Sequence, residues 1–179
     1  MSSVSRSVSR SVSRSVSRSV LGSMQKTLDQ LIKSLFANNE QGFAYDPNDL
    51  TTMFQDAAGT IPVTGAGQPV GLIRDKSGNN NHAFATSSAT RPILQRNATT
   101  GAYYLAFDGT DDFLVTNSID FTGTDKVSLF AGVRKLSDEK AGALIEFSSN
   151  ASTTAGAFGI NAPDAASSPD YLVRLRGNF

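Results

Sequence analysis

The sequence predicts an all-β protein, an antiparallel β-sandwich or jelly roll, preceded by an extended repeat and one short amphipathic helix. Two observations predict the sandwich. From about Gly42 onward, short runs of β-branched and aromatic residues recur, and clusters of Gly, Asn, Asp, Pro and Ser separate them. This alternation of strands with turn chemistry is typical of sandwiches and jelly rolls. In addition, no segment between the runs has a helical pattern long enough for a β-α-β unit.

Composition narrows the class of function. The 179 residues carry 16 basic and 16 acidic side chains, so the net charge is zero, which argues against a generally cationic nucleic-acid binder. The absence of cysteine excludes disulfides, thiolate metal sites and cysteine catalysis, and the single histidine, His82, excludes a histidine-rich metal site. No apolar run approaches the ~20 residues that span a bilayer. We therefore expect no membrane span.

Residues 1–22 form a leader built on a Ser-Val-Ser-Arg repeat that holds four arginines and no acidic residue. In an extended chain every Ser lies on one face, and Val and Arg share the other. A disordered low-complexity tail is the plainer interpretation. The sharper one is an assembly peptide whose Val/Arg face docks on a partner while its backbone augments a sheet edge. The leader residues assigned to assembly are Val4, Arg6, Val8, Arg10, Val12, Arg14, Val16 and Arg18.

Residues 23–41 are predicted to form the short helix and a linker. Ser23 is a good N-cap, and Asn38-Asn39 end the helical pattern. Several apolar residues also fit alternating three- and four-residue steps, over fewer heptads than a coiled coil needs. Packing on its own domain is the plainer interpretation, and self-association into a small bundle is the alternative. The helix residues assigned to assembly are Leu28, Leu31 and Leu35.

Residues 42–179 are predicted to form the sandwich. The expected strands are 70–73, 93–95, 103–107, 113–116, 127–135, 143–147, 157–160 and 171–176. Two turns between them are rich in residues that tolerate left-handed backbone or bond their own backbone. The first spans 75–83, and the second, at 107–114, is predicted to close a hairpin in which Gly109 supplies a positive φ.

The two turns resemble motifs of the concanavalin A-like lectin/glucanase sandwich of the laminin-G-like type. The first motif is carried by Asp75, Ser77, Gly78, Asn79, Asn81, His82 and Ala83, and the second by Leu105, Phe107, Asp108, Gly109, Asp111, Asp112, Phe113 and Leu114. Upstream residues 45–50, 53–56 and 69–71 are similar to the lead-in of such domains in bacteriophage and prophage virion proteins. Because the chain stops on a strand-like run, we expect a sandwich that is incomplete at its C-terminus or completed by another chain.

The same turns are the candidate metal site. Calcium binds six to eight oxygen ligands, and carboxylates and turn carbonyls supply them. The candidate ligands are Asp75, Asn79, Asp108, Asp111 and Asp112. A plain structural turn is the first interpretation of these residues and a structural calcium ion is the alternative, which the resemblance allows. No other cofactor is predicted.

Catalysis is not expected. A Ser-His-Asp triad would have to include His82, and no G-x-S-x-G elbow is present to hold the serine. The E-x-D-x-x-E pattern of the sandwich glucanases is also missing, so glycoside hydrolysis is a distant third interpretation. The strongest small-ligand alternative is glycan binding, because the resemblance includes many lectins. The candidate aromatic rings are Tyr45, Tyr103, Tyr104 and Tyr171, and we expect either Tyr103 or Tyr104 to belong to the core.

These observations predict a non-enzymatic bacteriophage virion protein, a tail, fibre or head-fibre component made in the bacterial cytoplasm. Its leader and helix would attach it to the particle, and its lectin-like sandwich would face outward for host contact. The expected partners are other virion proteins, further copies of the chain (a trimer among the options) and a host-surface glycan; nucleic acid is not an expected partner. A carbohydrate-binding module is the alternative function.

Overall fold

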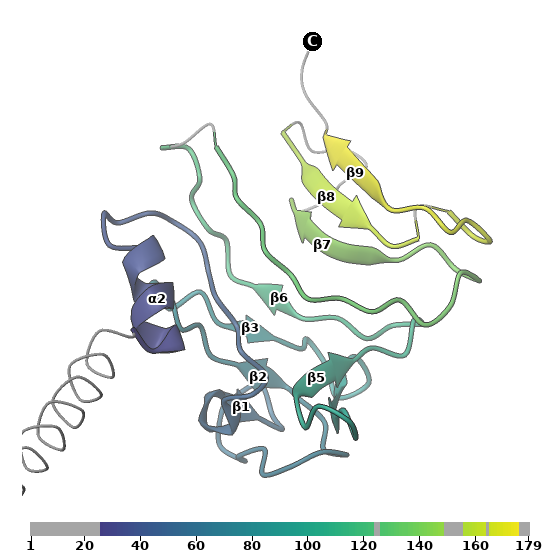
Figure 1. The fold of residues 1–179 in the computed structure, drawn as a ribbon, viewed down its shortest axis with the longest axis horizontal. Coiled ribbons are helices and arrows are strands. Elements are labelled where there is room, and N and C mark those ends of the chain that lie inside the picture. Colours follow the sequence, from purple (N-terminus) through teal and green to yellow (C-terminus); the bar gives the residue numbers. More distant parts are fainter. Residues whose placement is uncertain (1–25, 124–125, 149–155, 164, 176–179) are drawn as a thin grey trace, which may run out of the picture. The chain divides into compact units, whose positions relative to one another are not determined.

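The computed structural model describes residues 26–123, 126–148, 156–163 and 165–175. The contacts divide the chain into two compact units, unit 1 (Met1–Gly123) and unit 2 (Thr124–Phe179). The described residues form antiparallel sheets with one α-helix, which confirms the all-β prediction (Figure 1). The leader lies outside the described residues, so its extended or disordered state stays a prediction, as does a single sandwich over 42–179.

Unit 1 contains a four-stranded sheet in the order β1-β2-β3-β6 and a separate pair, β4-β5. The strands are β1 (Met53–Phe54), β2 (Leu72–Ile73), β3 (Ala83–Phe84), β4 (Ile93–Arg96), β5 (Tyr103–Ala106) and β6 (Val115–Thr116). Met53 lies opposite Ile73, and Ile73 lies opposite Ala83. Directly opposite residues share a face of the sheet, so these three side chains form one apolar row.

That row forms part of the hydrophobic core of unit 1. Val63, Val70 and Leu94 complete the buried cluster, and the half-buried rings of Tyr45 and Tyr103 pack against it. The strands are short, yet β1, β2, β3 and β4 each place an apolar side chain in this cluster, and burying one such side chain contributes about 1.5–3 kcal/mol. The core therefore holds the turns that connect these strands in place.

Unit 2 is a three-stranded antiparallel sheet in the order β7-β8-β9. Its strands are β7 (Ala143–Phe147), β8 (Phe158–Asn161) and β9 (Leu172–Leu175). Phe147 lies opposite Phe158, and the two ring centroids are 5.7 Å apart. This aromatic pair packs across β7 and β8, whereas the residues of β9 are all exposed.

The structure corrects two strand predictions. Residues 127–135 form no strand, although their side chains alternate, because the structure gives them no ladder partner. The turn at 107–114 does not close a hairpin: β5 pairs with β4, whereas β6 pairs with β3. Gly109 does have the predicted positive φ, 72°. Two strands, β1 and β3, were not predicted, because two residues are too short for a periodic signal.

The helix is shorter than predicted. α2 (Leu28–Leu35) begins after Thr27, which is the N-cap in place of the predicted Ser23; Ser23 itself lies outside the described residues. Thr27 Oγ1 accepts a hydrogen bond from the Gln30 amide at 3.2 Å, and Gln30 Oε1 accepts one from the Thr27 amide at 2.9 Å. This reciprocal capping box satisfies two amide groups at the first turn. It fixes the N-cap of α2 four residues after Ser23.

Candidate functional site

The helix α2 carries an exposed row of leucines. The side chains of Leu28, Leu31 and Leu35 are 57%, 47% and 62% exposed. Their spacing of three and four residues places them on one face of the helix. Ile32 and Phe36 are half-buried and lie beside this leucine face, on the side of the helix that also carries Asp29. The leucine face is therefore available for a partner while its neighbours contact unit 1.

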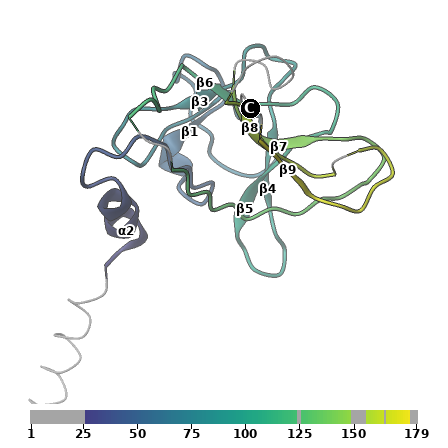
Figure 2. The same ribbon diagram turned by 90° about the horizontal axis from the view of Figure 1, so that it is seen from above.

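Two contacts fix α2 to the rest of unit 1. The Asp29 carboxylate lies 2.8 Å from Lys76 Nζ. The Phe36 ring packs so close to Gly42 that a Cβ atom there would lie 3.0 Å from it. Both contacts are on the side of the helix away from Leu31, so they hold the leucine face outward. Figures 1 and 2 both show α2 at the periphery of unit 1.

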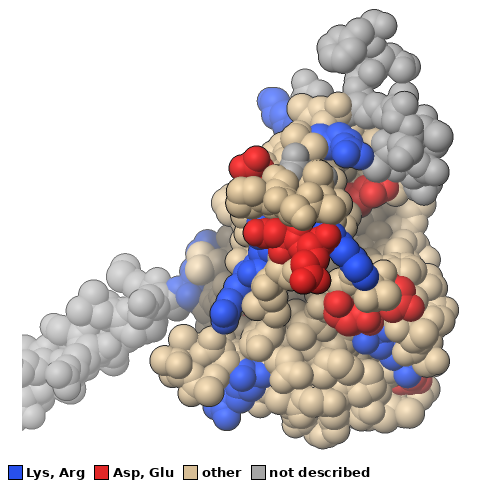
Figure 3. Space-filling view, turned by 90° about the vertical axis from the view of Figure 1, so that its right-hand side faces the viewer, with Lys and Arg blue, Asp and Glu red and all other residues tan. Residues whose placement is uncertain are grey.

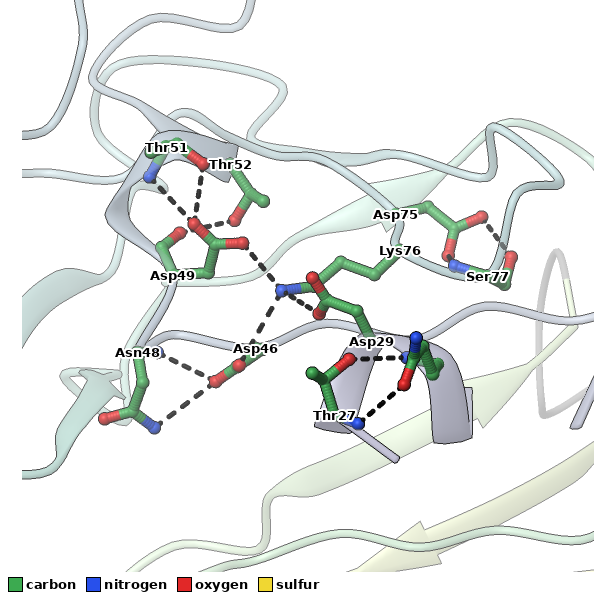
Figure 4. A network of polar contacts seen from close by, with 11 residues as sticks. Thr27, Asp29, Asp46, Asn48, Asp49, Thr51, Thr52, Asp75, Lys76 and Ser77 are labelled. Atoms are coloured by element: carbon green, nitrogen blue, oxygen red, sulfur yellow. Dashed lines mark hydrogen bonds and ion pairs between the residues drawn. The ribbon is translucent and has the colours of Figure 1, made fainter. Parts of the chain in front are cut away.

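Lys76 is the centre of this attachment (Figure 4). Besides Asp29, its ammonium group lies 2.6 Å from Asp49 Oδ2 and 3.9 Å from Asp46 Oδ2. Burial favours the neutral amine, but the hydrogen bonds to Asp29 and Asp49 outweigh it and raise the pKa of Lys76. The same hydrogen bond from Lys76, together with that from Thr51, lowers the pKa of Asp49. One lysine thus joins α2 to the segment that begins η1 (Leu50–Thr52).

The first predicted turn is organised by the carboxylate of Asp75. Its Oδ1 accepts hydrogen bonds from the amides of Ala44 at 2.9 Å and Ser77 at 2.8 Å. Its Oδ2 accepts hydrogen bonds from Ser77 Oγ at 2.6 Å and from the Asn81 amide at 3.0 Å. Four donors saturate the lone pairs of a carboxylate. This carboxylate therefore holds the turn together, and calcium binding at Asp75 stays a prediction.

The other polar residues of this turn hold the chain around Gly42. The Asn79 side-chain amide donates to the carbonyls of Glu40 at 3.0 Å and Gly42 at 3.1 Å, and the Asn81 side-chain amide donates to the Gly42 carbonyl at 2.8 Å. His82 Nδ1 accepts a hydrogen bond from the Asp75 amide at 3.1 Å. The ring nitrogen that could act as a base is thus engaged by backbone, which supports a structural role for this histidine.

The second turn holds the remaining candidate calcium ligands. Carboxylate oxygens of Asp108, Asp111 and Asp112 lie within 4.8 Å of one another. Asp108 Oδ1 accepts hydrogen bonds from the amides of Thr110, at 2.8 Å, and of Asp111, at 3.2 Å. Asp112 Oδ2 accepts one from the Asp108 amide at 2.9 Å. These bonds build a turn, and calcium binding stays a prediction for this cluster. The cluster does not include Asp75, which belongs to the other turn.

The cluster repels itself electrostatically. Burial raises the pKa of Asp112, and the charges of Asp108 and Asp111 raise it further against the lowering effect of the hydrogen bond from the Asp108 amide. Because the pKa of Asp112 is higher in the folded protein than in the unfolded chain, the free energy of unfolding is highest below the unfolded-state pKa near 3.9. It falls as the pH rises through the pKa of the folded state. At neutral pH, an ionised Asp112 therefore lowers the free energy of unfolding.

Replacing Asp112 with asparagine is expected to stabilise unit 1 at pH 7 by a few tenths of a kcal/mol, about the value of an exposed charge pair. The Asn oxygen can still accept from the Asp108 amide, and the gain should vanish at about pH 3, where the carboxyl group is protonated. Thermal unfolding in chelator at both pH values measures this.

The matched control is D120N, which should destabilise at pH 7 because hydrogen bonds from Thr122 lower the pKa of Asp120. A D112N protein less stable than the wild type in chelator would contradict the repulsion. Added calcium would stabilise only the wild type if this turn binds it.

The four candidate glycan-binding tyrosines differ in environment. Tyr45 stacks on Phe43 at 5.0 Å, and its hydroxyl donates to the Asn81 carbonyl; burial, and then the charge of Asp75, raise its pKa. Tyr103 packs against the core, whereas Tyr104 on the next position of β5 is exposed, as predicted for a strand. Tyr171 is exposed in unit 2 beneath Lys135. Tyr45 and Tyr103 are thus parts of the packing, and two exposed rings remain, one in each unit.

No sequence pattern predicts the network of ion pairs centred on Lys76. Lys76 lies inside the first motif, and its partners Asp46 and Asp49 lie in the lead-in at 45–50, but no sequence pattern indicates that these segments meet. Asp29, 47 positions before Lys76, lies outside both motifs. The nearest signal is the helix N-terminus itself, where an acidic residue such as Asp29 is favoured by the helix dipole.

Comparisons of the chain with protein-family models, with curated proteins and with solved structures find no match. In the part of the chain that the structure describes, no helix has the length and apolar character needed to cross a membrane. On the face shown in Figure 3, the acidic and basic side chains of the described residues lie in small neighbouring groups. The features of the chain that bear on its function are therefore the exposed leucine face of α2 and the sequence motifs.

Proposed function

We propose that this chain is a non-enzymatic structural protein of a bacteriophage particle, attached through its N-terminal leader and α2, with its β-rich body displayed as a lectin-like sandwich. The observation that carries the proposal is the orientation of α2. Its capped N-terminus, the Asp29–Lys76 ion pair and the Phe36 contact present three leucines away from unit 1. A helix face fixed in this way is suited to docking in an apolar groove.

The leader indicates the chemistry of the partner. It carries four arginines and no acidic residue directly before the helix. A complementary particle protein would offer carboxylates for these arginines beside an apolar groove for Leu28, Leu31 and Leu35. Electrostatic complementarity of this kind accelerates encounter and selects the partner, while the leucines supply buried area. The proposed binding partner of the leucine face is thus another protein of the particle, with an apolar groove rimmed by acidic residues.

A structural role also agrees with how the polar residues are used. His82 and Asp75 bond the backbone of their own turn. In β7, Glu146 Oε1 accepts a hydrogen bond from Ser148 at 2.6 Å. A carbohydrate-binding module remains the alternative function, for which Tyr104 and Tyr171 offer exposed rings. The attachment proposal has more support, because an ordered helix face carries it.

The test is co-sedimentation with purified particles, followed by mass spectrometry. The tagged full-length chain should sediment with particles. Deletion of residues 2–22, or the triple variant L28S/L31S/L35S, should reduce the bound amount by about tenfold or more, since each leucine contributes about 1.5–3 kcal/mol when buried. The matched control is Leu136→Ser, because Leu136 is 75% exposed, more than any of the three helix leucines, but lies in unit 2. Its binding should equal that of the wild type.

The leucine variant should keep the fold, because none of the helix leucines is buried. Circular dichroism and thermal unfolding should therefore match the wild type. A folded deletion or leucine variant that sediments with particles as fully as the wild type would refute attachment through this region.

A further inference from the structure

The strand β9 is an open sheet edge. It is the last strand in the order β7-β8-β9, and β8 is its partner on the inner side. Within the described residues no strand or bridge pairs with its outer side. Val173 and Leu175 are 58% and 73% exposed, and Tyr171 just before the strand is 56% exposed. An apolar edge of this kind is a template for another strand.

The register shows that one face of the sheet is entirely apolar. Ile145 lies opposite Ile160, which lies opposite Val173. In the neighbouring row, Phe147 lies opposite Phe158, which lies opposite Leu175. The members of this face are Ile145, Phe147, Phe158, Ile160, Val173 and Leu175. The residues on β7 and β8 are half-buried, whereas the two on β9 are exposed. Exposure thus increases toward β9, where the apolar face stops at the open edge.

We infer that β9 binds β9 of a second copy of this chain, antiparallel around a twofold axis. An isologous contact of this type uses the same surface on both copies. Opposite residues in an antiparallel pair share a face. The apolar face of one copy continues into that of the second copy only if the twofold axis passes through a residue of the strand. An axis between two residues would place Val173 opposite a residue of the other face, such as Leu172 or Arg174. Leu172, Val173 and Arg174 are the positions to compare, because an axis at Leu175 would place Arg174 opposite residue 176, which lies outside the described residues.

Charge selects among these positions. An axis at Leu172 places Arg174 directly opposite Asp170 of the second copy, twice by symmetry, and Val173 opposite the second copy's Tyr171. An axis at Arg174 instead places two arginines face to face, and an axis at Val173 places Arg174 opposite leucine. Opposite charges and aromatic–β-branched pairs across strands are favourable, and like charges are unfavourable. Within the described residues, neither Arg174 nor Asp170 forms an ion pair. The contact is therefore centred on Leu172.

A charge exchange in the full-length chain tests this register by sedimentation equilibrium. The wild type should dimerise reversibly. R174D alone and D170R alone should each raise the dimer dissociation constant by about tenfold, because each creates like-charge pairs across the axis. The double variant D170R/R174D should restore wild-type dimerisation. A wild type that stays monomeric at concentrations up to about 100 μM would overturn the inference. Failure of the double variant to recover would overturn it equally.

Cysteine cross-linking provides a second, independent measurement. The chain contains no cysteine, so a single introduced thiol can react only with its counterpart in another copy. L172C should form a disulfide-linked dimer on mild oxidation, since this residue faces itself across the axis, and V173C should do so much more slowly. Faster cross-linking of V173C would overturn the register. Adding L28S/L31S/L35S should leave the L172C reaction unchanged, which separates this contact from the attachment proposed for α2.

Discussion

Replacing Gly71 with alanine is expected to lower the free energy of unfolding of unit 1 by about 4 kcal/mol, a loss found only where a mutation forces a severe clash or cavity. A Cβ atom at this position would lie 2.6 Å from the carbonyl oxygen of Gln55 and 2.8 Å from backbone atoms of Asp56. These contacts are with backbone, so no side-chain rotation can relieve them.

The backbone around Gly71 cannot shift without losing sheet contacts. Its amide donates to the Phe54 carbonyl at 2.8 Å, and its carbonyl accepts from the Ala85 amide at 2.9 Å. Moving the chain to admit a methyl group would separate β2 from both neighbouring segments. The matched control is Gly65→Ala, because a Cβ there meets nothing within 4 Å. We expect G65A to change stability by no more than about 1 kcal/mol.

Thermal unfolding followed by circular dichroism compares the two alanine variants. G71A should unfold at a midpoint more than about 10 °C below that of the wild type, or fail to fold. A G71A protein with the melting temperature of G65A would show that β1 and β2 do not approach as closely as described here.

Replacing Asp75 with asparagine is expected to destabilise unit 1 by about 3 kcal/mol, because hydrogen bonds to charged groups are strong and unpaired buried donors are costly. The carboxylate accepts four hydrogen bonds, two at each oxygen. In asparagine an NH₂ group replaces one oxygen, so two of the four donors would face another donor and lose their acceptor. Two of the donors belong to Ser77, whose side chain is buried. The damage should therefore spread from the turn to the segment around Ala44.

The matched control is D111N, on the second turn. Asp111 is exposed, so its substitution should change stability by only about 0.5 kcal/mol. Urea unfolding of the three proteins measures both changes. Equal midpoints for D75N and D111N would contradict the central role of Asp75. Hydrogen exchange should also show faster exchange of the Ala44 and Asn81 amides in D75N, since both donate to this carboxylate.

Much of the local structure could be predicted. The strands β4 and β7 lie where β-branched and aromatic runs predicted them, because such residues favour a pleated, half-buried surface. The positive φ of Gly109 and the structural role of His82 also followed from turn chemistry within a few residues. These features depend on neighbours in the sequence, and local propensity is informative about them.

Partner choice could not be predicted in the same way. The turn after β5 has the expected positive φ at Gly109, yet it connects two different sheets, because β6 pairs with β3 and not with β5. The alternating pattern of 127–135 gave a false strand, since alternation describes the faces of a strand and not its partner. The exposed state of Leu28 likewise depends on Asp29 meeting Lys76, 47 residues away.

The sequence by itself determined the β-rich class, the two polar turns, the short leucine-bearing helix and the absence of thiol chemistry. All of these depend on composition or on residues close together in the chain. Only the tertiary structure decided which strands pair, where α2 begins, which side of it faces outward, and that Asp75 is fully engaged by its own turn. Those outcomes require contacts between distant segments, because the free energy of such contacts depends on packing and burial that no local pattern encodes.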